Sequence, residues 1–386
     1  MREPLPSAAW TAALAGLPGM GPARLSAILR RWPPDEAWEA VTAARAHLDP
    51  VVAATVRIPE LCASRWRTSA QDTDVAALWA AHGAAGVDVR APGEPGFSPV
   101  LGADPEPPAV LFTRGHLGAL DRPRVAIVGT RRCTWAGRSI AAELGAGLAS
   151  AGVCVVSGLA LGIDGAAHRG ALATEGAPPV AVVGTGLDVV YPRRHADLWE
   201  EVAAAGALVS EYPLGTRPEP WRFPARNRLV AALADVLVVV ESHARGGSLH
   251  TVTAALERGV GVMAVPGPVR AAASAGTNAL LVAGAAPVRD ADDVLIALGL
   301  DSAAACRRPP PDEVGLDPDE AILLADLRQS PATVEQLASR LDRSLAAVAV
   351  DLVRLEARGL VIASGSWWEA TGTYPDPQGP GGGSVP

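Results

Sequence analysis

The feature that most constrains the fold is a series of short apolar runs between residues 125 and 299, each followed by a stretch of helical composition. The runs are VAIVG (125–129), VCVVSG (153–158), VAVVG (180–184), ALVSE (207–211), VLVVVE (236–241) and VGVMAVPG (260–267). Because apolar and polar residues do not alternate in them, they are typical of strands that are covered on both faces. Strands that alternate with helices form parallel sheets. The sequence therefore predicts a Rossmann-like, doubly wound α/β domain with a mostly parallel sheet.

The regions on either side of this domain have a different composition. The first 115 residues are rich in Ala and Trp and show helical apolar periodicity, with no convincing strand before Val110. Near the C-terminus, two helices and a hairpin are expected after three consecutive prolines. The predicted parts are a helical domain of the SAM or helix-hairpin-helix type (1–115), the α/β domain (116–300), a proline-rich linker (301–316), a winged helix-turn-helix domain (317–374) and a disordered tail (375–386).

Composition excludes several kinds of site. All 33 basic residues are arginines, so a P-loop lysine, a pyridoxal Schiff base and a lysine general base are excluded. The net charge of −8 means that any nucleic-acid site has to be a local patch. Residues 121–138 and 217–228 carry net charges of +4 and +3, whereas 317–374 carries −4. The negative net charge of residues 317–374 is unfavourable for binding duplex DNA and favours a protein-contacting role for the winged helix.

The four cysteines give no sign of a metal site. They are scattered, form no CxxC pair and have no histidine at zinc-ligand spacing, so we expect free thiols, no metal and no cofactor. The N-terminus lacks the features of a signal peptide, and no run approaches the ~20 apolar residues that a membrane helix needs. We therefore expect a cytoplasmic protein without a membrane partner.

Ligands of open α/β sheets bind beyond the carboxyl ends of the strands, and three of these ends are rich in glycine. Gly129, Thr130 and Arg131 follow the first run, where a helix start and an arginine suit a phosphate, although a salt bridge across the sheet edge explains the arginine equally well. Gly184 and Gly186 follow the third run and begin like a dinucleotide fingerprint. The third glycine is missing, and a Tyr-Pro pair stands where the helix should begin, so a nicotinamide cofactor is not expected.

The second of these ends contains Ser157, Gly158 and Gly162. Asp164 and His168 follow, four residues apart on a predicted helix, and they face each other there. They form either an acid and base pair or, as we prefer, a structural histidine held by an aspartate at the helix start.

The densest basic segment is PWRFPARNR at 220–228, where three arginines are interleaved with Trp221 and Phe223. Guanidinium groups and aromatic faces together suit single-stranded nucleic acid. The equally favoured alternative is that both aromatic rings are core residues and the arginines a solvated helix start. A second glycine-rich segment, RGGSLHT at 245–251, is able to wrap a phosphate in backbone N–H groups.

A glycine pair also occurs near the N-terminus. LAGLPGMGPARLSAIL at 14–29 places Gly19 and Gly21 in a turn between two helices, as in helix-hairpin-helix units. Such turns present N–H groups to phosphates, but a plain helical connection is the commoner explanation.

Taken together, VAIVGTR, VVSGLALGIDGAAHRGAL, AVVGTGLDVVYP, LVSEYPLGT, FPARNRLVAAL, VVVES followed by GGSLHT, VPGP and GTNALLVAGA resemble the DNA-processing protein A family, also called Smf. The match runs in order from about Phe97 to about Val288. The resemblance implies a non-enzymatic protein that binds single-stranded DNA, protects incoming DNA, forms a homodimer and helps to load a RecA-type recombinase in natural transformation. The dimer surface would lie roughly between Leu256 and Leu300.

The resemblance also implies a DNA pocket at the strand ends described above. Its residues are Gly129, Thr130, Arg131, Ser157, Gly158, Gly162, Gly184, Gly186, Phe223, Arg226, Asn227, Arg228, Gly246, Gly247 and Ser248. The chain departs from the family at Leu161, where many members have a basic residue, and at Gly246, where they have a serine. The loss of one phosphate contact would lower affinity and its salt dependence without removing the site.

An alternative function is that of a nucleotide phosphoribohydrolase, whose fold is related and whose loop reads PGGxGTxxE. Gly246, Gly247 and Thr251 resemble this loop, but Ala254 stands where the glutamate is required. No general acid or base is then evident, so no catalytic residue is predicted.

Overall fold

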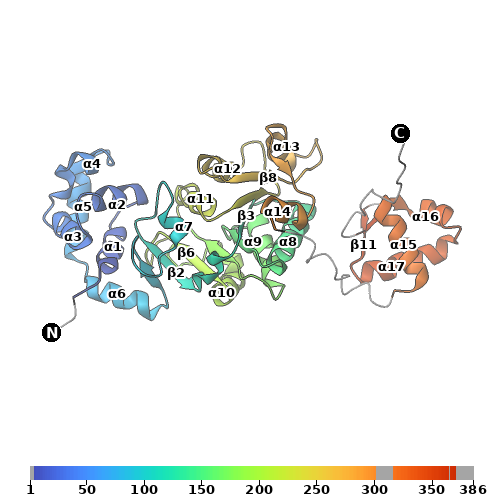
Figure 1. Ribbon diagram of the computed structural model, residues 1–386, viewed down its shortest axis with the longest axis horizontal. Coiled ribbons are helices and arrows are strands. Elements are labelled where there is room, and N and C mark those ends of the chain that lie inside the picture. The colour runs from blue at the N-terminus through green and yellow to red at the C-terminus, as the bar shows by residue number, and fades with distance from the viewer. Residues whose placement is uncertain (1–3, 301–315, 365, 371–386) are drawn as a thin grey trace, which may run out of the picture. The chain divides into compact units, whose positions relative to one another are not determined.

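The structure is a computed structural model that describes residues 4–300, 316–364 and 366–370. The chain divides into two compact units, Met1–Ala303 and Ala304–Pro386 (Figure 1). Most of the predicted linker and all of the predicted tail lie outside the described residues.

The N-terminal unit contains a sheet of nine strands in the order β1-β2-β6-β5-β4-β3-β7-β8-β9. The six predicted runs form β3 (Arg124–Val128), β4 (Cys154–Ser157), β5 (Val180–Val182), β6 (Ala207–Ser210), β7 (Val236–Val239) and β8 (Gly261–Ala264). Every neighbouring pair from β6 to β9 (Ala286–Pro287) is parallel. The prediction of a mostly parallel sheet is confirmed.

The two strands at one edge of the sheet are joined to it by antiparallel pairs. β2 (Leu111–Gly115) pairs with β6 and with β1 (Asp88–Arg90). The expectation that no strand precedes Val110 is therefore wrong for β1. This strand is only three residues long, too short for periodicity to reveal it, and it pairs only because β2 lies beside it.

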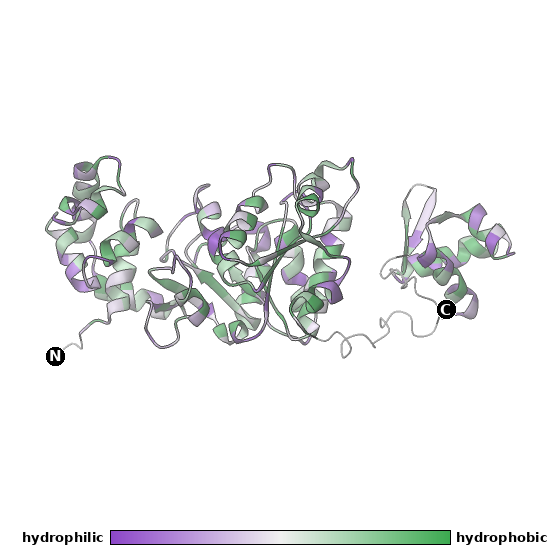
Figure 2. Ribbon diagram, turned by 45° about the horizontal axis from the view of Figure 1, so that its top comes forward, coloured by the Kyte–Doolittle hydropathy of each residue, from purple (hydrophilic) through white to green (hydrophobic). Residues whose placement is uncertain are grey.

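Helices cover both faces of the sheet. α8 (Trp135–Ser150), α9 (Ile163–Leu172) and α14 (Ala291–Ala297) pack on the face that contains Val125 and Ile127 of β3. α11 (Arg222–Ala232) and α12 (Ser248–Glu257) pack on the face that contains Ala126 and Val128. Successive residues of β3 thus enter different cores, which explains why its sequence does not alternate. Figure 2 shows the apolar residues concentrated on the strands.

Helices before the sheet share its core. These are α1 (Ser7–Ala15), α2 (Pro22–Leu29), α3 (Pro34–Thr42), α4 (Pro50–Ala53), α5 (Pro59–Gln71) and α6 (Val75–Ala84). Their apolar cluster continues into Ala181 and Leu208 of the sheet and into Trp199 of α10 (Ala196–Ala205). The remaining helices of the unit are α7 (Pro99–Gly102), α13 (Ala275–Val282) and the 3-10 turns η1 (Ala46–Leu48), η2 (Leu117–Asp121), η3 (Arg193–His195) and η4 (Ala272–Ser274). The N-terminal helices are thereby fixed against the sheet.

The C-terminal unit has a core of its own. Its elements are α15 (Pro318–Gln329), β10 (Ala332–Thr333), α16 (Val334–Arg340), α17 (Leu345–Ala357), β11 (Val361–Ser364) and β12 (Trp367–Ala370). The three strands form an antiparallel sheet in the order β10-β12-β11. Asp317 with Glu320, and Thr333 with Gln336, form capping boxes that begin α15 and α16. Leu323, Leu352 and other leucines fill the core between the helices.

Close packing of α8 on α9 generates a testable prediction. A methyl group on Gly170 would overlap the carbonyl oxygen of Ala142 in α8, whereas one on Gly83 in α6 would meet nothing within 4 Å. We expect Gly170→Ala to lower the free energy of unfolding by about 1–3 kcal/mol through overpacking. The control Gly83→Ala should raise it by about 0.5–1 kcal/mol through helix propensity. Urea unfolding measures both, and an unchanged midpoint for Gly170→Ala would contradict the packing described.

Candidate nucleic-acid interface

The carboxyl ends of β3, β4 and β7 meet the start of α11 around a cleft of about 840 Å³. Ten of the fifteen predicted DNA-binding residues line it: Gly129, Thr130, Arg131, Gly158, Phe223, Arg226, Asn227, Gly246, Gly247 and Ser248. Arg132 and Arg245 also line it, and both are exposed, as is Arg131. We refer to this space as the sheet-edge cleft.

The loop after β3 is fixed by the end of β7. The backbone N–H of Thr130 donates to the Glu241 carbonyl at 2.8 Å, and the Glu241 carboxylate accepts from the N–H of Thr134 at 2.9 Å and from its hydroxyl at 2.6 Å. Thr134 in turn caps α8. The hydroxyl of Thr134 thereby accepts from one of the N–H groups at this helix start, that of Gly137. The loop also presents the exposed side chains of Arg131 and Arg132.

The loop after β4 is held by a buried arginine. Arg226 is 4% exposed, and its Nη1 donates to the carbonyl of Gly158 at 2.9 Å. The N–H of Gly158 donates to the carboxylate of Asp164 at 3.2 Å. Burial lowers the pKa of Arg226 to about 10 and raises the pKa of Asp164, while each of these two charges favours the other. Arg226 therefore lines the cleft chiefly as a structural residue.

The expected pairing of Asp164 with His168 is wrong in both versions. Asp164 accepts from Gly158, and the charged neighbours that act on the buried His168 are His195 and Arg226. Burial, followed by His195, lowers the pKa of His168 to about 3, so its ring is neutral at physiological pH. The spacing of four residues placed both side chains on one helix, but the aspartate turned toward a backbone donor.

Aromatic rings line the cleft on the α11 side. The Arg131 guanidinium carbon lies 5.0 Å from the centroid of the Phe223 ring, and the Tyr191 ring lies 5.2 Å from it. Phe223 is half-buried, while Trp221 is 45% exposed. The alternative that both aromatic residues of this segment belong to the core is therefore wrong for Trp221.

The glycine-rich loop before α12 needs its first glycine for space. A Cβ on Gly246 would overlap the hydroxyl of Ser242, to which Ser248 donates at 2.9 Å. α12 begins at Ser248 after Gly247, without a side-chain cap. The N–H groups of Leu249 and His250 donate to the carbonyls of Gly246 and Gly247 at 3.1 and 3.3 Å, so only some of the N–H groups at this helix start are available to an anion.

Five predicted residues lie outside the sheet-edge cleft. Gly184 lines a small adjoining hollow of about 40 Å³ together with Tyr191 and Phe223. Ser157 is fully buried and donates to the Ile127 carbonyl at 2.6 Å. Gly162 begins α9 with φ of +83°, a conformation that favours glycine.

The other two take part in packing or ion pairing. The N–H of Gly186 donates to the Thr216 carbonyl at 3.0 Å. Arg228 donates to the buried carboxylate of Glu211 and, at 2.8 Å, to the carbonyl of Glu106. The structure thus brings most of the predicted residues together but gives Ser157, Gly186 and Arg228 structural surroundings.

Residues 88–299, more than half of the chain, match the family model described as DNA recombination-mediator protein A. The chain belongs to this family. The DNA recombination-mediator family match covers the whole sheet and every residue of the sheet-edge cleft.

Bacterial members of the DNA recombination-mediator family are similar to this chain in sequence and structure. Protein Smf of Escherichia coli is 37% identical over 273 residues, which are 69% of this chain and 73% of that protein. DNA processing protein DprA of Streptococcus pneumoniae is 41% identical over 188 residues, 49% of this chain and 66% of that protein. The X-ray structure of DNA processing protein A from the same organism matches with a TM-score of 0.61 and 29% identity, covering 76% of this chain and 98% of that chain.

Several residues that line the sheet-edge cleft were not among the DNA-binding residues predicted from the sequence. Arg132, Tyr191 and His250 line the cleft. The position of Arg132 next to Arg131 in a short loop was an available signal. Tyr191 belongs to the Tyr-Pro pair and His250 to RGGSLHT, two segments noted in the sequence, but that these two side chains line the cleft depends on how the loops fold together. Within the described part of the chain, no cluster of metal-ligating side chains is found, and no helix is long and apolar enough to cross a membrane.

The pair of Glu211 with Arg228 generates a prediction about pH. Burial raises the pKa of Glu211 to about 7 although Arg228 donates to it. In the unfolded chain the Glu211 carboxyl loses its proton near the ordinary pKa of a glutamate. The higher pKa in the folded protein therefore stabilises the fold fully at low pH, and this stabilisation is lost as the pH rises through 7. The Glu211→Gln variant has no ionisable carboxyl at this position, so its stability does not change with pH for this reason. We expect the variant to gain up to about 3 kcal/mol of unfolding free energy relative to the parent between pH 5 and pH 8.

Urea unfolding at four pH values across this range measures the difference. The slope of unfolding free energy against urea concentration should stay the same in both proteins, since the exposed surface does not change. A difference that is constant with pH would contradict a shifted pKa for Glu211.

Proposed function

We propose that this protein binds single-stranded DNA in the sheet-edge cleft. The observation that carries the proposal is an excess of exposed positive charge: Arg131, Arg132 and Arg245 line the cleft, and its one lining carboxylate, Asp164, is buried against Gly158 and Arg226. Such a surface attracts phosphates locally in a protein whose net charge is −8.

The aromatic residues support a single strand rather than a duplex. Tyr191 is exposed and Phe223 half-buried at the rim of the cleft, so ring faces are available to unstacked bases. Stacking on an aromatic ring is worth about 1–3 kcal/mol per base and does not depend on base identity. Together with phosphate contacts, it predicts binding that is independent of sequence.

The chemistry of the cleft supports a binding protein rather than an enzyme. The position that would carry a phosphoribohydrolase glutamate is Ala254, which is buried in α12. Asp164 is committed to Gly158, and His243 uses its Nδ1 on the carbonyl of Ala272 at 3.0 Å. A general acid or base needs a free group within reach of the substrate. The exposed His250 also lines the cleft and is not held in this way, so Ala254 is the observation that speaks against a phosphoribohydrolase.

We also propose the partners that the family suggests. A protein that mediates recombination prepares single-stranded DNA for a recombinase. We therefore expect a RecA-type recombinase to bind the same DNA strand after this protein. For a homodimer, the supporting observation is a set of exposed apolar side chains in the last part of the N-terminal unit: Leu256, Val269, Val282 and Ile296. The C-terminal unit has the element order of a winged helix, and the net charge of −4 over its residues 317–374 favours a protein partner.

A salt titration of single-strand binding tests the main proposal. Arg131→Ala should weaken binding to a labelled oligothymidylate about tenfold at low salt, because a phosphate contact is lost. It should also reduce the slope of log affinity against log salt by about 0.7. Arg138→Ala removes an equal charge from an exposed position on α8 outside the cleft, and it should leave both quantities nearly unchanged.

Competitors separate this function from the alternative. An excess of duplex or of nucleoside monophosphate should displace the strand poorly. Effective displacement by a monophosphate, with release of ribose 5-phosphate, would support the phosphoribohydrolase instead.

The dimer proposal is tested by sedimentation velocity. Val282 is 91% exposed at the end of α13, and Val282→Glu would place a charge in an apolar interface. We expect this variant to sediment as a monomer at concentrations where the parent is dimeric. Leu48→Glu, at an exposed position among the N-terminal helices, is the matched control and should remain dimeric. A parent protein that is monomeric throughout would refute the proposal.

A further inference from the structure

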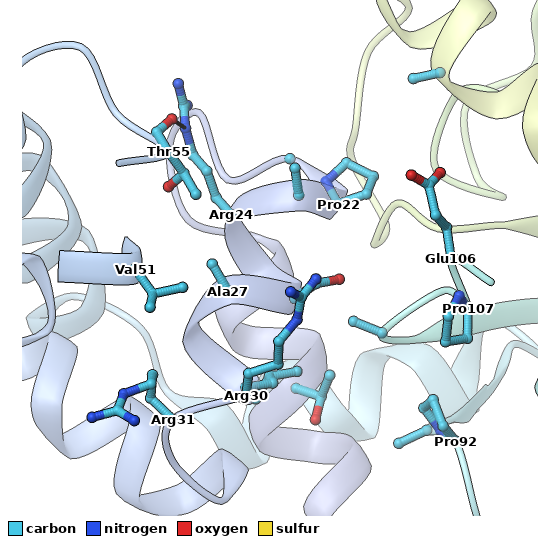
Figure 3. Close-up of a pocket in the computed structure, with 18 of the residues that line it drawn as sticks. Pro22, Arg24, Ala27, Arg30, Arg31, Val51, Thr55, Pro92, Glu106 and Pro107 are labelled. Atoms are coloured by element: carbon cyan, nitrogen blue, oxygen red, sulfur yellow. Dashed lines mark hydrogen bonds between the residues drawn. The ribbon is translucent and has the colours of Figure 1, made fainter. Parts of the chain in front are cut away.

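A second, larger cleft lies within the N-terminal unit, between the N-terminal helices and the start of α11. Its volume is about 1630 Å³. One wall carries Arg24, Ala27 and Arg30 of α2, and the opposite wall carries Glu106 and Pro107 (Figure 3). Trp221, Arg222, Ala225 and Arg228 close it on the α11 side. We refer to this space as the helical-domain cleft.

Positive charge exceeds negative charge along its lining. The lining arginines are Arg24, Arg30, Arg31, Arg222 and Arg228, and the lining carboxylates are Glu106 and Glu219. Arg31 is paired with Asp49, Arg222 with Glu219 and Arg228 with Glu211. These pairs neutralise three of the five charges.

Two arginines of α2 keep their charge available. Arg24 donates to the carbonyl of Gly19 and, at 3.2 Å, to that of Thr55, and carbonyls carry no formal charge. Arg30 is exposed, and no hydrogen bond or ion pair joins its side chain to the described residues. The wall formed by α2 is therefore suited to contacting phosphates.

Residues at the start of α11 line both clefts. Phe223, Arg226 and Asn227 line the sheet-edge cleft, whereas Trp221 and Arg222 line the helical-domain cleft. The exposed indole of Trp221 lies over the turn that contains Gly21, where an added Cβ would be 3.6 Å from the ring. The guanidinium of Arg222 lies 5.0 Å from the centroid of this ring. A stacking surface thus stands between the two basic clefts.

We propose that a single DNA strand bound in the sheet-edge cleft continues past Trp221 into the helical-domain cleft. Trp221 stacks one base at the crossing, and Arg24 and Arg30 contact the phosphates that follow. This inference rests on the proposed function, because it extends the same strand. An acidic peptide would satisfy the arginines equally well, but it would make no use of the exposed indole or of the continuity with the first cleft.

The test compares oligothymidylates of increasing length on the full-length protein. Strands long enough to fill only the sheet-edge cleft should bind the parent and Arg30→Ala equally. Longer strands should bind the parent more tightly, and for them Arg30→Ala should lose about 3- to 10-fold in affinity, with a salt slope lower by about 0.7. Arg67→Ala, an exposed arginine of α5 outside both clefts, is the charge-matched control and should behave as the parent at every length.

Tryptophan fluorescence gives a second readout. The chain has ten tryptophans, so the signal of interest is the difference between the parent and Trp221→Phe. Long strands should quench the parent more than this variant, and short strands should quench both equally. This measurement reports the crossing even if Arg30→Ala has a small effect.

The outcomes separate this inference from the function on which it rests. If Arg131→Ala weakens binding while Arg30→Ala and Trp221→Phe behave as the parent at every length, the second cleft is not on the strand's path and the proposed function stands. If the parent binds no strand at low salt, both fail. If polyglutamate binds in a manner that depends on Arg30 while long strands do not, the occupant is an acidic protein segment and the inference is refuted.

Discussion

The buried contacts of α11 with the sheet edge are the interaction on which the rest of the site depends. Arg226 donates to the carbonyl of Gly158 after β4, and Arg228 donates to the carboxylate of Glu211 after β6. Taking a guanidinium out of water is costly unless its partners are in place, so these contacts hold α11 in one position. That position places Phe223 on one cleft and Trp221 on the other. Arg226 and Arg228 thus orient the side chains of this segment that line the two clefts.

Charge in this protein is arranged locally. Acidic residues outnumber basic ones by eight, yet most of the charged residues that line the two clefts of the N-terminal unit are arginines. Since the chain contains no lysine, every side chain with a permanent positive charge is a planar guanidinium, which is able to donate in pairs and to stack on a ring. The contacts of Arg131 with Phe223 and of Arg222 with Trp221 show this second property within the protein itself.

Much of the fold could be predicted because its signals are local. A run such as VLVVVE predicts a strand buried on both faces, and β7 is found there. The edge strands β1 and β9 have three and two residues, so they have no period to detect and form only where a neighbour offers its hydrogen bonds. The capping boxes of α15 and α16 are likewise local signals, since their partners are three residues apart.

The sequence by itself determined which strand ends carry glycine and arginine, and therefore at which edge of the sheet the cleft lies. Tertiary structure alone decided which of those residues face solvent. Arg131 and Arg226 are the same residue type in equally basic segments, yet one is exposed and the other buried. It also brought the turn at Gly21 beside Trp221, two hundred residues apart. The physical reason is that burial of a charged side chain depends on partners that are distant in the chain. Local sequence patterns do not reveal which residues these partners are.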